Sequence, residues 1–77
     1  MQEQIQIRPL TATILAEVGK FGECRDVRGV EVFRRTLNGA NWKMEVTPDS
    51  MTLTAECLTR LTLIEEQMQA KYELIPG

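Results

Sequence analysis

The chain has 77 residues, a formal net charge of −2 and no histidine. It is too short for more than one domain, so residues 1–77 are predicted to form a single small domain with a marginal core. The absence of histidine removes the side chain that most often performs acid–base chemistry at neutral pH. The acidic balance also argues against a general polyanion-binding protein.

Two cysteines, Cys24 and Cys57, stand far apart in the sequence. The opening residues MQEQIQIRPL contain neither the basic nor the apolar segment of an export signal, and no stretch approaches the roughly 20 apolar residues of a membrane span. We therefore expect a cytoplasmic protein in which both thiols are reduced. Without histidine or a C-x-x-C motif, the chain offers no usual set of metal ligands, and we predict no metal and no other cofactor.

The first predicted element is a short strand over residues 4–8, where isoleucines alternate with polar neighbours and Pro9 ends the pairing. A helix of about two turns follows, with Thr13 as its N-cap and Gly19 or Gly22 as its end. The apolar face of this helix consists of Ile14, Leu15, Val18 and Phe21.

Residues 23–37 fit two different structures. Apolar residues recur here every three or four positions, which favours an amphipathic helix. They are Cys24, Val27, Val30, Phe33 and Leu37. Against the helix, Gly29 would lie in its interior at a cost of about 1 kcal/mol, and the Asn-Gly pair that follows is a strong hairpin signal. We predict the helix and keep, as the alternative, a hairpin that pairs residues 30–37 with 42–47.

In both versions residues 42–47 form a strand, and the only tryptophan, Trp42, shares one face of it with Met44 and Val46. Trp42 is therefore predicted to fill the core, with its indole N–H near the edge, where a carbonyl can accept it. The alternative for this side chain is a role as an interface anchor.

The longest predicted element is a helix over residues 54–73, with Thr54 as its N-cap. A start near residue 48 is the alternative, because Thr47 and Pro48 also form a helix-start pattern. One side of the helix carries a continuous apolar face. Its members are Cys57, Leu58, Leu61, Ile64, Met68 and Tyr72.

A second group of apolar residues, Leu63, Ala70 and Leu74, lies on roughly the opposite side of this helix. A domain of this size gains little from its own core. Its charge is divided between a basic middle segment and an acidic C-terminal segment, which suits pairing of two copies in opposite orientation. We therefore expect a homodimer with these three residues at the contact and Trp42 as a further candidate.

These elements predict an α+β domain, in which a small, single-layer short β-sheet of residues 4–8 and 42–47 is covered by the long C-terminal helix, with one or two shorter helices. No motif assigns a catalytic residue or indicates a family. We predict a non-enzymatic interaction module that self-associates and could also bind another protein, without nucleic-acid or membrane binding. The alternative is a weak nucleic-acid-binding protein that uses the arginines of residues 25–35. The third hypothesis is a thiol-dependent enzyme or redox protein that uses Cys24.

Overall fold

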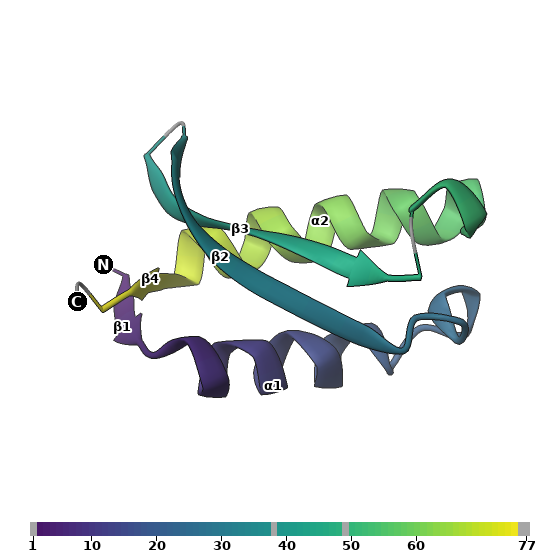
Figure 1. Cartoon of the computed structure of the whole chain (residues 1–77), viewed down its shortest axis with the longest axis horizontal. Coiled ribbons are helices and arrows are strands. Elements are labelled where there is room, and N and C mark those ends of the chain that lie inside the picture. Colours follow the sequence, from purple (N-terminus) through teal and green to yellow (C-terminus); the bar gives the residue numbers. More distant parts are fainter. Residues whose placement is uncertain (1, 38, 49, 76–77) are drawn as a thin grey trace.

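A computed structural model describes residues 2–37, 39–48 and 50–75 of the chain (Figure 1). The fold is mixed α+β: a long β-hairpin lies across two helices, and a short pair of strands joins the first and last elements. In chain order the elements are β1 (Glu3–Ile5), α1 (Ile7–Val18), the 3-10 turn η1 (Gly22–Cys24), β2 (Gly29–Leu37), β3 (Ala40–Thr47), the 3-10 turn η2 (Ser50–Thr52), α2 (Ala55–Lys71) and β4 (Tyr72–Leu74). Within these residues, no helix has the length and apolar character needed to cross a membrane.

The hairpin is formed by β2 and β3, which pair in antiparallel orientation with Val32 opposite Met44. The predicted helix over residues 23–37 is therefore wrong, and the hairpin alternative is correct in outline. Alternating β-branched residues in the GVEVF segment favour an extended strand, and this preference outweighs the helical spacing of the apolar residues. Gly39 has a φ of 85°, which glycine adopts without steric cost; Asn38 lies outside the described residues.

Helix α1 begins at Ile7, earlier than the predicted N-cap at Thr13. Pro9 lies in its first turn, where a backbone N–H would have no partner within the helix and proline is therefore tolerated. The predicted strand over residues 4–8 is consequently shorter and occupies Glu3–Ile5. Residues 7 and 8, which the alternation of isoleucines predicted to be part of a strand, therefore lie in the first turn of α1.

Helix α2 begins at Ala55, and Thr54 caps it by accepting a hydrogen bond from the Cys57 N–H at 3.1 Å. The start near residue 54 is confirmed, and a start near residue 48 is excluded. The helix ends at Lys71, short of the predicted end at residue 73, because Tyr72–Leu74 leave the helix and form β4.

The strands form two separate sheets instead of one. β1 pairs in parallel with β4, and Ile5 lies beside Leu74. The predicted single sheet of residues 4–8 with 42–47 is therefore wrong, since β1 finds its partner at the other end of the chain.

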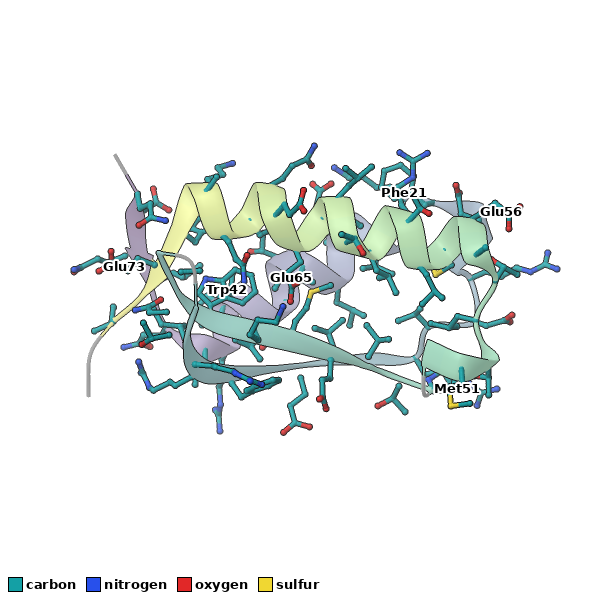
Figure 2. All side chains as sticks on the ribbon, turned by 90° about the horizontal axis from the view of Figure 1, so that it is seen from above. Phe21, Trp42, Met51, Glu56, Glu65 and Glu73 are labelled. Carbon is teal, nitrogen blue, oxygen red and sulfur yellow. A yellow bond between two sulfur atoms is a disulfide. The ribbon has the colours of Figure 1, made fainter. Side chains whose placement is uncertain are left out.

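The core lies between the hairpin and the helices, and Trp42 is its largest fully buried side chain (Figure 2). Its indole Nε1 donates a hydrogen bond to the carbonyl oxygen of Tyr72 at 3.2 Å. The prediction of a buried tryptophan bonded to a carbonyl is confirmed. The other buried residues come from every major element; they are Leu10, Ile14, Val18, Cys24, Val32, Cys57, Leu61, Ile64, Met68 and Leu74.

Cys24 and Cys57 form a disulfide, with their Cα atoms 5.0 Å apart. The prediction of two reduced thiols is wrong, because η1 brings Cys24 against the first turn of α2, a proximity that sequence spacing does not reveal. The same region is held by Arg60, whose guanidinium lies 4.4 Å from the centre of the Phe21 ring and 3.6 Å from a carboxylate oxygen of Glu23. In this disulfide the sulfur of Cys24 is not a thiolate nucleophile.

Candidate interaction surface

The edge of β3 that faces away from β2 is covered by side chains of α2. The Met44 N–H donates to Glu65 Oε2 at 3.0 Å, and Gln69 Nε2 donates to the Trp42 carbonyl at 2.8 Å. The other oxygen of Glu65 pairs with Lys43 Nζ at 3.1 Å. We call this the closed edge, because one helix supplies both a donor and an acceptor to the strand's outward backbone groups.

The closed edge continues into β4 through the side chain of Asn41. Asn41 Nδ2 donates to the Leu74 carbonyl at 2.9 Å, and the Leu74 N–H donates to Asn41 Oδ1 at 3.0 Å. The amide of one side chain therefore bonds to both backbone groups of a strand residue, much as a neighbouring strand would. Together with the indole of Trp42, it attaches β4 to the hairpin.

The opposite edge, formed by β2, has no such cover. Because the Met44 N–H points toward α2, the pair of Met44 and Val32 is not hydrogen-bonded, so the backbone groups of Val32 also point away from the hairpin. The same alternation turns the N–H and C=O groups of Val30 and Arg34 outward. Within the described part of the chain, these backbone groups have no hydrogen-bond partner. We call this row of groups the open edge.

The outward-facing side chains of β2 form a short series of an acid, an aromatic ring and a base. Val30 and Val32 face the core, so Glu31, Phe33 and Arg35 lie on the outer face of the hairpin. Phe33 is half-buried but is not among the residues packed against the core. Neither charged residue of this series has an ion-pair partner among the residues described.

The four residues predicted at an interface divide into two groups. Leu63 is 43% exposed, and Ala70 is exposed two turns further along the same side of α2. Leu74 and Trp42 are fully buried within the single chain, so neither can present its side chain to a second copy. Leu74 lies in β4 and therefore does not share the predicted face with the other two. The predicted contact face is thereby reduced to Leu63 and Ala70.

The arginines of residues 25–35 do not lie along one helix. The nucleic-acid hypothesis placed them along a helix, but Arg25 and Arg28 precede β2, and the strand turns Arg34 and Arg35 toward opposite faces. Arg34 Nη2 donates instead to the Ile75 carbonyl at 2.6 Å. The helical surface on which that hypothesis placed them is therefore not formed.

A shallow groove of about 370 Å³ lies between α2 and β3. Its walls are formed by Met44, Glu45, Val46, Leu58, Leu61, Thr62 and Glu65. Glu65 already bonds to Met44 and Lys43, so this carboxylate serves the fold. Across the described ranges, no cluster of three or more cysteine, aspartate or glutamate side chains is arranged to hold a metal ion.

Sequence reasoning missed the open edge because residues 23–37 were assigned to a helix, which has no edge. The strand-forming residues of GVEVF indicate a strand here, but they do not indicate which edge of that strand stays uncovered. Comparisons with known proteins add no assignment: no family model, curated protein or solved structure matches the chain.

Proposed function

We propose that this chain is a non-enzymatic interaction module that acts as a homodimer, and that two copies join through β2. The observation that carries the proposal is the open edge. A strand edge with unpaired N–H and C=O groups is a template for another strand, and natural proteins usually cover or interrupt it. Here the strand is nine residues long, and its outward groups at Val30, Val32 and Arg34 are left without partners in the described chain.

The helix beneath this edge supports the same proposal. α1 packs against β2 and leaves Ile7 37% exposed and Leu15 39% exposed. A strand added beside β2 extends the sheet over α1, so it would cover apolar surface as well as satisfy backbone groups. Removing such surface from water stabilises an association by roughly 25 cal/mol per Å².

The test is a proline substitution at the open edge. Proline at residue 34 removes an outward N–H but no hydrogen bond of the hairpin, so Arg34→Pro should fold as a monomer. Arg34→Ala is the matched control, because it loses the same guanidinium contact with Ile75 but keeps the backbone N–H. Sedimentation equilibrium over roughly 1–100 μM covers the range in which dimers held by about 8 kcal/mol dissociate.

We expect dimers in the wild type and in Arg34→Ala, and monomers in Arg34→Pro with an unchanged far-UV circular dichroism spectrum. A wild-type chain that remains monomeric throughout this range contradicts the proposal. Dimers that persist in folded Arg34→Pro place the contact elsewhere on the molecule.

A further inference from the structure

We infer that the two copies pair β2 with β2 in antiparallel orientation about a two-fold axis at Phe33, over the segment 31–35. This inference rests on the proposed function and specifies its register. In a two-fold contact the same segment lies on both sides, so each pair of residues occurs twice. The two β2 strands can bond only where outward-facing backbone groups of one copy lie opposite outward-facing groups of the other. This condition is met when the two-fold axis passes through a residue, and it fails when the axis passes between two residues. Axes at Glu31, Val32, Phe33 and Arg34 all meet this condition over the open edge.

The side chains of the outer face select Phe33 from these four positions. With the axis there, Glu31 lies opposite the second copy's Arg35, and Phe33 lies opposite its own counterpart. These are non-hydrogen-bonded pairs, in which the side chains are closest and opposite charges or aromatic rings stabilise the sheet.

The other axes leave the charges unmatched. An axis at Glu31 places two carboxylates opposite each other, and an axis at Arg34 places two guanidinium groups opposite each other, with Phe33 facing arginine. An axis at Val32 sets Glu31 opposite Phe33 and leaves Arg35 opposite Gly29. Like charges directly opposite are destabilising, so Phe33 is the only position that pairs both charges with opposite ones.

The single chain also contains a repulsion that this register offsets. Glu31 lies directly opposite Glu45 in the hairpin. The second copy's Arg35 would lie on the other side of Glu31 and bring a positive charge beside the two carboxylates. The β2–β3 register shifts between Arg34 and Leu37, so the regular pairing within the hairpin ends at Arg34, one residue before the end of the segment that the axis at Phe33 uses.

The assembly in this register is closed. Its sheet has the strand order β3–β2–β2–β3, with both pairs of helices on one face. The two outer edges are then the closed edges, whose outward groups already bond to Glu65 and Gln69. No open edge remains along 31–35, so association stops at two copies and does not continue into a fibre.

The test is a charge-reversal cycle measured by sedimentation equilibrium on the full chain. Glu31→Arg and Arg35→Glu each place like charges opposite each other twice, so each should raise the dimer dissociation constant about tenfold or more. The double variant restores opposite charges, and so does an equimolar mixture of the two single variants. Both should associate with a dissociation constant within about threefold of the wild-type value. Glu66→Arg, an exposed site on α2, makes the same change in net charge as Glu31→Arg and should have little effect.

The outcomes separate the register from the proposed function. If the wild type dimerises but the single variants do so equally well, this register is wrong while self-association stands. If the single variants are weakened but neither the double variant nor the mixture recovers, the two charges do not face each other and the register is again wrong. A wild-type chain that is monomeric at every concentration overturns the proposed function itself. Thermal unfolding of each variant, at a protein concentration below its dimer dissociation constant, identifies any variant that fails to fold. The mixture of single variants that do fold then decides the register.

Discussion

The two edges of the hairpin differ because the helices beneath them carry different side chains. α2 lies beside β3 and reaches its outward backbone groups with the long polar side chains of Glu65 and Gln69. α1 packs against β2, but the hydroxyls of Thr11 and Thr13 bond back to carbonyls of α1 itself, and none of its described side chains bonds to β2. The fold therefore has the means to close an edge and uses them on one side only. This asymmetry is what makes the open edge informative about function.

Replacing a buried side chain on the closed side should have the largest effect. Trp42→Ala removes the largest buried side chain and its bond to Tyr72, and we expect the free energy of unfolding to fall by about 3–5 kcal/mol. Phe33→Ala, on the open side, removes an aromatic ring that is not packed against the core and should cost about 1 kcal/mol or less in the monomer. Urea unfolding of both variants at low protein concentration measures the difference. Equal losses would show that the closed side is not the more firmly packed one.

Removing the disulfide should lower the free energy of unfolding, but the closed edge should stay bonded to α2 and the open edge should stay uncovered. The bridge spans a sequence separation of 33, for which the loop-entropy relation gives about 3–4 kcal/mol. Cys24→Ala/Cys57→Ala should lose this amount, and a reducing agent should produce the same loss in the wild type but not in the double variant. Urea unfolding with and without the reducing agent provides the measurement. A reductant effect in the cysteine-free chain would show that the loss does not come from the bridge.

The same substitution at both edges tests the comparison directly. Met44→Pro removes an N–H that bonds to a carboxylate, so relative to Met44→Ala it should lose about 1.5–3 kcal/mol. Arg34→Pro relative to Arg34→Ala removes an N–H without a partner in the described chain and should lose well under half as much. Thermal unfolding of the four variants, below the concentration at which the wild type dimerises, gives both differences. Similar losses at both positions would mean that the open edge is bonded in the monomer.

The smallest effect is expected on the exposed face of α2. Leu63→Glu changes a side chain that is 43% exposed and lies away from both edges, so stability should change by no more than about 0.5 kcal/mol. Its dimer dissociation constant should match that of the wild type. Sedimentation equilibrium checks this, and conversion of Leu63→Glu to a monomer would move the contact from β2 to the face of Leu63 and Ala70.

The correctly predicted parts of the fold depend on local signals. The start of α2 follows from Thr54, whose side chain caps the helix as its residue type suggests. The strand containing Trp42 follows from alternation over a few residues, and so does the burial of that side chain. In each case the residues that carry the signal are also the ones that make the contact.

The remaining parts depend on contacts between distant residues. Tyr72 and Leu74 continue the helical region in sequence, and only their proximity to β1 and Asn41 makes them a strand. The pairing of Cys24 with Cys57 likewise requires η1 to lie against α2. Which edge of the hairpin stays open depends on which backbone groups the side chains of α1 and α2 reach. No residue of β2 encodes that property by itself.

The pairing of β1 with β4 has a consequence for how the chain folds as it is made. The ribosome releases residues 3–5 before the hairpin and α2, whereas their partners, residues 72–74, emerge after both. Until then, the core lacks the side chain of Leu74, and the indole of Trp42 lacks the carbonyl of Tyr72. The hairpin and the helices can form from local contacts, but the contact between the first and last described strands forms after them. The nascent domain is therefore completed in one late step, when β4 pairs with β1 and bonds to Asn41.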